Sequence, residues 1–138
     1  MALRYMLDTN AFSDLVKNPR GRVATTVAHV ENTRNAKVCV SVIVAAEVRY
    51  GVEKKGSRKL SRQVEAILRV TEIVPLEPGA DMRYAQIRVD LEHSGKVISA
   101  NDYFIAAHAL ATDSILVTNN VREFARVKGL RTENWLAD

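Results

Sequence analysis

Three acidic residues stand out in this sequence because each lies beside or within an apolar run. Asp8 ends a short apolar segment, Glu47 interrupts another, and Asp102 precedes a third. An ionised carboxylate in apolar surroundings is costly unless a positive charge lies nearby. The three acids therefore predict a shared divalent cation, and a ligand set made of oxygen atoms favours Mg²⁺ or Mn²⁺.

Asp8 also has a simpler interpretation. Asp, Thr and Asn all favour the position that caps a helix, and Asp8, Thr9 and Asn10 precede a helix expected from residue 11. One capping residue is enough, however, and the preceding strand aims Asp8 at the edge of the sheet where ligands bind. We therefore expect Asp8 to bind metal, with Asn10 orienting either Asp8 or a substrate phosphate.

Glu47 and Asp102 leave two interpretations open from local pattern alone. Glu47 could be a surface residue or the partner of an internal arginine, although its neighbours one turn away indicate an inward face. Those neighbours are Ile43, Val44, Tyr50 and Gly51. Asp102 could merely complement the helix dipole, with Ser99 or Asn101 as cap, yet the apolar helix that follows would bring its first turn against the sheet.

Five further residues are weaker candidates. Asn120 and Glu123 have the spacing of a capping box, which explains both without chemistry unless a site lies nearby. Arg49, Lys54 and Lys55 are candidate contacts for an RNA backbone. A solvated helix face explains these three basic residues equally well.

Short segments rich in Val, Ile and Leu alternate with longer segments of helical pattern. The strand-like segments are residues 4–7, 37–40, 73–76 and 114–117. The helical segments are residues 11–17, 22–33, 43–54, 60–70, 80–94 and 103–112. This alternation predicts an α/β fold with a mainly parallel central sheet, covered on both faces, that binds ligands beyond the carboxyl ends of its strands. Asp8 and Thr118 lie at such ends.

The composition is that of an ordinary globular protein. The chain has 138 residues, 47% hydrophobic and 26% charged, so we expect a single domain spanning residues 1–138. The sequence contains no recognisable leader peptide or membrane-spanning run, which predicts a cytoplasmic protein without a membrane partner. Cys39, the only cysteine, is expected in the core. The net charge of +4 suits a nucleic-acid partner.

Several common enzyme classes are disfavoured by missing motifs. His29, His93 and His108 have no metal-ligand spacing, and His108 lies on an apolar helix, as a packed histidine would. The sequence contains no Walker glycine loop, dinucleotide fingerprint, serine elbow or HExxH motif. What remains is carboxylate chemistry.

The sequence resembles the PIN-domain ribonucleases, and among them the VapC-type toxins of bacterial toxin–antitoxin pairs. Four segments in the same order carry the resemblance: residues 6–10, 41–51, 101–109 and 117–124. The resemblance implies a three-layer α/β/α sandwich in which Asp8, Glu47 and Asp102 bind metal and Thr118 supports the acidic pocket. Many members have a fourth acid where this sequence has Asn120, with Glu123 one turn later. An amide adds no negative charge, so the number of metal ions is left open.

The resemblance also implies a reaction and partners. Mg²⁺ or Mn²⁺ would activate a hydroxide for in-line attack on an RNA phosphodiester, leaving 5′-phosphate and 3′-hydroxyl ends. Such a type II toxin would inhibit translation by cutting RNA, with tRNA and its initiator anticodon loop favoured and mRNA or rRNA loops still open. A cognate VapB-like antitoxin that covers the site groove, and a homodimeric assembly, are the expected partners.

Two other functions are compatible with the sequence. An aspartyl-phosphate phosphatase would use a strand-end aspartate such as Asp8 as its nucleophile, although Asn10 replaces the usual second acid. A non-catalytic module that binds RNA or a protein partner would fit the replacement of an acid by Asn120. A phosphoenzyme would identify the first function, and RNA binding independent of Mg²⁺ would identify the second.

Overall fold

The computed structural model describes residues 3–33 and 35–136, and its centre is a sheet of five parallel strands. The strands are β1 (Leu3–Leu7), β2 (Ala36–Ser41), β3 (Glu72–Val74), β4 (Ile115–Val117) and β5 (Thr132–Glu133). Their spatial order is β3-β2-β1-β4-β5, so β1 is central and pairs with β2 and β4. The prediction of a parallel central sheet is confirmed.

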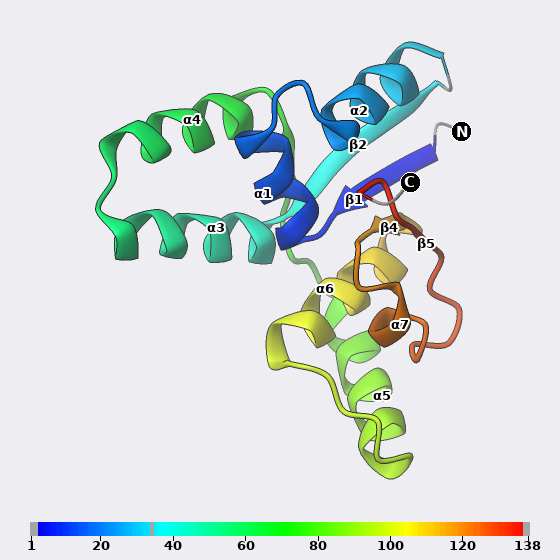
Figure 1. Cartoon of the computed structure of the whole chain (residues 1–138). Helices are drawn as coiled ribbons and strands as arrows, with labels where there is room; N and C mark the ends of the chain where they lie inside the picture. The colour runs from blue at the N-terminus through cyan, green and yellow to red at the C-terminus, as the bar shows by residue number, and fades with distance from the viewer. Residues whose placement is uncertain (1–2, 34, 137–138) are drawn as a thin grey trace.

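Helices cover both faces of this sheet (Figure 1). α1 (Thr9–Lys17) and α2 (Arg22–Thr33) lie on one side, and α5 (Ala80–His93), α6 (Ala100–Ala111) and α7 (Val121–Phe124) lie on the other. α3 (Val42–Lys55) and α4 (Arg58–Arg69) form an antiparallel pair that extends beyond the sheet. These layers make the expected α/β/α sandwich.

The order of the strands reverses at β1. The chain moves outward from β1 to β2 and β3, and α5 and α6 then return it to β4 on the opposite side of β1. In open α/β sheets such a reversal marks the position of ligand binding, beyond the carboxyl ends of the two strands. Asp8 directly follows β1 and Thr118 directly follows β4, so both lie at this position.

The helices that carry the candidate acids begin earlier than predicted because polar residues cap them. α1 starts at Thr9 with Asp8 as its cap, and α6 starts at Ala100 with Ser99 as its cap. α3 starts after Ser41 and ends at Lys55. Gly56 follows as its C-cap, with a φ of 67°, the left-handed conformation that glycine adopts freely.

Two strands differ from the prediction. β3 ends at Val74, two residues early, because Pro75 has no amide hydrogen to contribute to a strand ladder. β5 is absent from the prediction, since two polar residues carry no apolar alternation, and it forms by pairing with β4.

Two buried residues behave as the sequence predicted. Cys39 lies in the core, and burial raises the pKa of its thiol to about 12, which leaves it inert. His108 is buried in α6. Within residues 3–33 and 35–136, no helix has both the length and the apolar character needed to cross a bilayer.

Candidate active site

Asp8 is a buried carboxylate with hydrogen-bond donors, and no lysine or arginine among the described residues forms an ion pair with it. Its side chain is 5% exposed, and its Oδ1 accepts a hydrogen bond of 2.8 Å from the backbone N–H of Ala11. Burial raises the pKa of Asp8, the negative charge of Glu47 adds to this rise, and hydrogen bonds from the Thr118 side chain and Ala11 oppose it. Asp8 therefore caps α1, as the simpler interpretation held, and also presents its carboxylate at the reversal of the sheet.

Glu47 lies in the second turn of α3 and is held by a hydroxyl group. Thr9 Oγ1 donates a hydrogen bond of 2.9 Å to Glu47 Oε1, and this bond joins the start of α1 to α3. No arginine or lysine among the described residues pairs with Glu47. The expected inward face is only partly correct, because Val44 is buried whereas Tyr50 is 66% exposed.

Asp102 lies in the first turn of α6, half-buried behind its cap. Its backbone N–H donates a hydrogen bond of 3.2 Å to Ser99 Oγ. Burial raises the pKa of Asp102, a hydrogen bond from Ser99 lowers it, and the negative charges of Glu47, Asp8 and Glu123 raise it further. The topology has thus brought together acids that are far apart in the sequence.

The segment after β4 closes this cluster, but not as a capping box. Asn120 begins α7 without a capping bond from its side chain, so that prediction is wrong. Its Nδ2 instead donates to Glu123 Oε2 at 2.9 Å, and its backbone N–H donates to Thr118 Oγ1 at 2.9 Å. Asn120 therefore holds Glu123 on the side facing the other acids, while the buried Thr118 serves both Asn120 and Asp8.

Asn10 and Thr9 form side-chain hydrogen bonds that the sequence did not predict. The Asn10 side chain donates a hydrogen bond of 3.3 Å to Asn119 Oδ1, which links α1 to the segment after β4 instead of orienting Asp8. Only the Asn10 backbone interacts with the Asp8 carboxylate. The sequence did not predict Thr9 as a site residue. The one feature that could have indicated it is its hydroxyl group next to Asp8, a candidate metal ligand.

The donor set fits a hard divalent cation in chemical type. Asp8, Glu47, Asp102 and Glu123 offer oxygen atoms only, and none of them pairs with a lysine or arginine of the described chain. After burial, the negative charge of neighbouring acids is a further cause that raises the pKa of Asp8 and Asp102. No three acidic, histidine or cysteine side chains in residues 3–33 and 35–136 converge closely enough to hold an ion as they stand. The acids would have to draw closer around a cation.

The three basic candidates, Arg49, Lys54 and Lys55, have different environments in the structure. Arg49 forms a double hydrogen bond with Glu65, at 3.0 and 2.9 Å, on the exposed surface between α3 and α4. Lys54 lies over the ring of Tyr50, with its Nζ 5.9 Å from the centroid. Lys55 alone lines a groove that also contains Glu47.

This groove of about 220 Å³ runs between α1, α3 and α4. Thr9 and Glu47 lie in it together with two lysines and a set of apolar residues. The lysines are Lys17 and Lys55, and the apolar residues are Val16, Val48, Val52, Leu60 and Val64. Gly51 also lines the groove, and a Cβ added there would meet no atom within 4 Å. The groove therefore combines apolar walls with charges of both signs.

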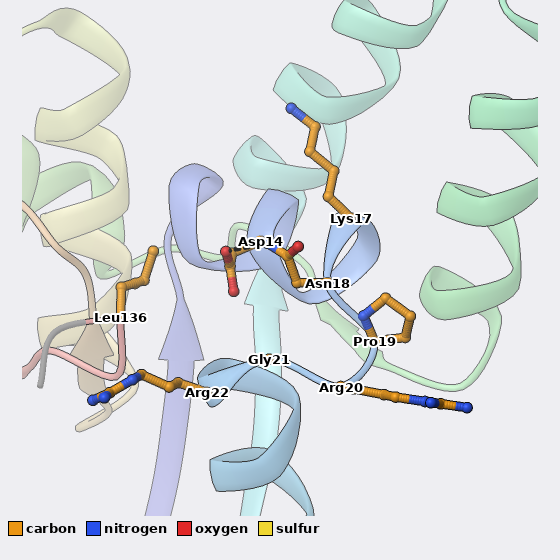
Figure 2. Close-up of a pocket in the computed structure, with 8 residues that line it drawn as sticks. All are labelled: Asp14, Lys17, Asn18, Pro19, Arg20, Gly21, Arg22 and Leu136. Atoms are coloured by element: carbon orange, nitrogen blue, oxygen red, sulfur yellow. Dashed lines mark hydrogen bonds between the residues drawn. The ribbon is translucent and has the colours of Figure 1, made fainter.

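A larger cavity of about 570 Å³ lies elsewhere, at the loop between α1 and α2 (Figure 2). Its basic side chains diverge: Figure 2 shows Lys17, Arg20 and Arg22 extending in different directions. Asp14, its acidic residue, accepts a hydrogen bond of 2.7 Å from Asn18. This cavity gathers no set of converging functional groups, so the acid cluster is the better candidate site.

The fold and the order of the acidic residues define the class of this protein. The PIN domain family matches residues 5–130, and the chain belongs to that family. Within the family it is of the VapC type. Ribonuclease VapC2 of Haemophilus influenzae is 40% identical over 136 residues, which cover 97% of this chain and 99% of that protein.

Two further relatives extend this likeness. The tRNA(fMet)-specific endonuclease VapC of Shigella flexneri is 35% identical, with 96% of this chain and 98% of that protein covered. The crystal structure of VapBC2 from Rickettsia felis bound to a promoter DNA fragment contains a chain that matches with a TM-score of 0.88 and 32% identity. That match covers 96% of this chain and 99% of the other.

Proposed function

We propose that this protein is a metal-dependent endoribonuclease and the toxin of a type II toxin–antitoxin pair. The observation that carries the proposal is the cluster of Asp8, Glu47, Asp102 and Glu123, which repel one another at the reversal of a parallel sheet. Such a cluster is unfavourable by itself and becomes favourable when a divalent cation neutralises it. The VapC-type relatives support RNA as the substrate.

Asp8, Asp102 and Glu47 are the residues that would hold Mg²⁺ or Mn²⁺, with Glu123 as a further ligand or a link through water. When bound, the cation would supply Lewis-acid stabilisation of the charge that develops on the scissile phosphate. The protein's own groups orient the ligands: Thr118 and Ala11 fix Asp8, and Thr9 fixes Glu47. Because these supports are neutral hydroxyl and amide groups, they orient the carboxylates without supplying a positive charge that would replace the cation.

We propose tRNA as the substrate, cut in an exposed loop. This substrate follows from the relatives in Shigella flexneri and Salmonella typhimurium, which are named as tRNA(fMet)-specific endonucleases and are 35% and 33% identical to this chain. A loop presents splayed bases and an accessible phosphate, which a site at the surface edge of a sheet requires. Cleavage of initiator tRNA in the cytoplasm would inhibit translation.

The groove beside Glu47 is the proposed seat of a VapB-like antitoxin. Its apolar walls suit apolar side chains of an extended or helical segment, and Glu47, the acid that lines it, suits a basic side chain. Gly51 leaves the wall open, although glycine within a helix costs about 1 kcal/mol relative to alanine. Structural neighbours that are VapBC complexes support this partner, and we also propose that the toxin is a homodimer.

The test uses end-labelled total tRNA with Mg²⁺, Mn²⁺ or EDTA. The purified protein is compared with Asp8→Asn and with Asp14→Asn, a matched control because Asp14 lies on the same helix outside the acid cluster. We expect one metal-dependent cut with 5′-phosphate and 3′-hydroxyl ends, lost in Asp8→Asn and retained in Asp14→Asn.

The same experiment separates the rival functions. Full cleavage by Asp8→Asn, in preparations free of contaminating nuclease, would contradict the assignment of the site. RNA binding without cleavage, equal with and without Mg²⁺, would indicate a binding module. Covalent phosphate on Asp8 would indicate a phosphatase.

A further inference from the structure

His108 takes part in a chain of hydrogen bonds, centred on two buried side chains, that the acid cluster does not include. The side chain is 1% exposed, and its Nδ1 lies 2.7 Å from Ser41 Oγ. Its Nε2 lies 3.1 Å from the carbonyl oxygen of Pro75. Ser41 is also completely buried, and its Oγ accepts a hydrogen bond of 3.0 Å from the backbone N–H of Ile43. Three separate elements meet at this one imidazole.

The partners determine which nitrogen of His108 carries the hydrogen atom. A carbonyl oxygen can only accept, so Nε2–H must be the donor to Pro75. Burial lowers the pKa of His108, against the opposing effect of the Pro75 hydrogen bond, so the ring is neutral and Nδ1 is an acceptor. The Ser41 hydroxyl must then donate to Nδ1 while its oxygen accepts from Ile43. Every donor in the chain has one acceptor.

This chain of bonds connects the two helices that carry candidate acids. Ser41 ends β2 and caps α3, and Glu47 lies six residues further along α3. His108 lies in α6, six residues after Asp102. Six residues span about 9 Å of helix, so a small rotation at the Ser41–His108 bond moves both carboxylates. Pro75, directly after β3, fixes the far side of the ring.

We propose that His108 is a positioning residue that, through Ser41, holds α3 and α6 in the relative placement that brings Glu47 beside Asp102. This inference rests on the proposed nuclease function and extends it to residues outside the acid cluster. The essential bond is the one from the Ser41 hydroxyl to Nδ1, because it joins the two helices directly. The bond to Pro75 orients the ring and does not reach α3.

Two substitutions of His108 separate these bonds. His108→Asn places an amide oxygen near the position of Nδ1, so it retains an acceptor for Ser41 and loses the bond to Pro75. His108→Gln extends its amide to the position of Nε2, so it retains the donor to Pro75 and loses the acceptor. The two variants differ in which bond survives, and asparagine, which retains the bond to Ser41, is also the smaller side chain by one methylene, so a larger effect of His108→Gln does not come from lost volume.

Ser41 and Ser57 provide a second matched pair. Ser41→Ala removes a helix cap together with the bond to His108, whereas Ser57→Ala removes only the cap of α4, where Ser57 Oγ accepts a bond of 3.1 Å from Leu60. Ser41→Thr retains the hydroxyl. Any effect that Ser41→Ala shares with Ser57→Ala is therefore the loss of a cap and nothing more.

The measurements are single-turnover cleavage of tRNA at saturating metal, normalised to the folded fraction, and hydrogen exchange of the first two turns of α3. We expect His108→Gln and Ser41→Ala to lower the cleavage rate about 10- to 100-fold with little change in KM, as a misplaced reacting group does. The α3 amides should exchange faster in both variants. His108→Asn, Ser41→Thr and Ser57→Ala should stay close to the native protein in both measurements.

The outcomes distinguish a positioning role from a purely structural one. If His108→Gln lowers the melting temperature while the folded fraction cleaves at the native rate, the positioning role is overturned. Hydrogen exchange tests the proposal independently of activity. If the native protein cleaves no RNA, the nuclease proposal fails. The α3 exchange rates of the His108→Asn and His108→Gln variants still test whether the Ser41–His108 bond holds α3 and α6 together. Equal α3 exchange in those two variants would overturn the proposal.

Discussion

Two polar regions on the same pair of helices are built in opposite ways. Around Asp8, Glu47 and Asp102, like charges lie near one another, and neighbouring charge and burial raise the pKa of Asp8 and Asp102. Around His108 and Ser41, whose side chains are buried, each donor meets one acceptor. Six residues of helix separate the two regions on α3 and on α6. The helices therefore carry an internally satisfied region and an unsatisfied one.

The difference between the two regions indicates which of them requires a bound ligand. A satisfied polar chain contributes to a unique arrangement of the core and needs no ligand. A group of mutually repelling carboxylates lowers stability, and natural proteins retain such local conflicts mainly at functional sites. This contrast supports the proposals that the unsatisfied region binds a cation and a phosphate and that the satisfied region positions it.

The largest expected effect comes from neutralising the unsatisfied region. Asp8→Asn should lower tRNA cleavage by about 1,000-fold or more, because the central oxygen ligand loses its charge. Asparagine can still cap α1 by accepting from Ala11, so the fold should be retained. A cleavage assay and a thermal melt on the same samples check this, and an inactive but unfolded variant would not support the comparison.

Metal should stabilise the unsatisfied region and leave the satisfied one unchanged. At a concentration of 100 times its Kd, Mg²⁺ or Mn²⁺ should add about 2.7 kcal/mol to the unfolding free energy, since it binds the folded state alone. Asp8→Asn should abolish this gain, and His108→Asn should retain it. Denaturant titrations with metal or EDTA measure the effect; equal gains in the native protein and Asp8→Asn would place the metal elsewhere.

The pH dependence of stability should differ between the two regions in sign. Folding raises the pKa of Asp8 above 3.8, so the folded state binds this proton more tightly than the unfolded state does. The contribution of Asp8 to stability therefore falls as the pH rises from 3.8 through the folded-state pKa. The pKa of His108 is lowered below 6.5, so its contribution is present above that value and is lost as pH falls.

Unfolding of the metal-free native protein and of Asp8→Asn isolates the contribution of Asp8, because both contain His108. The variant should be the more stable by about 1 kcal/mol near pH 7, and the advantage should shrink toward pH 4 as Asp8 becomes protonated. An advantage that grows with acidity would contradict the assigned direction of the pKa shift.

Asn120→Asp should add one more acid to the unsatisfied region. The change replaces the bond from Asn120 to Glu123 by repulsion, so the metal-free protein should lose up to about 1 kcal/mol of stability. The same change should tighten metal binding, because another carboxylate faces the site. A denaturant titration without metal measures the loss of stability, and calorimetric titration with Mn²⁺ measures the affinity. Unaltered affinity would show that residue 120 lies outside the metal's reach.

The smallest effect is expected from an ion pair that belongs to neither region. Arg49→Ala breaks the exposed pair with Glu65 and should change stability by no more than about 0.5 kcal/mol, because solvent screens such pairs. The RNA affinity of Arg49→Ala is compared with that of Lys55→Ala, because Lys55 lines the groove with Glu47. If Arg49→Ala weakens RNA binding more than Lys55→Ala, the phosphate path does not follow the groove.

Much of this arrangement could be predicted from the sequence because it depends on short-range patterns. Apolar runs identified four of the strands, and the acid after β1 and the acid opening α6 follow from their position beside those runs. The face of Glu47 was less predictable. α3 extends beyond the sheet with α4, so Tyr50 meets solvent even though its spacing resembles that of a buried residue.

The sequence by itself determined which segments form strands and which polar residues cap the helices. It also determined the chemical type of the candidate site, which is a set of carboxylate oxygens without a basic partner. Only the tertiary structure decided which groups meet. Thr9 bonds to Glu47 and Asn10 to Asn119, and neither pair was predicted. Asn120 and Glu123 were paired by their spacing, but the bond joins their two side chains instead of forming a capping box. The Ser41–His108 bond spans 67 residues. Such contacts depend on how parallel strands are ordered and helices packed, which no local periodicity encodes.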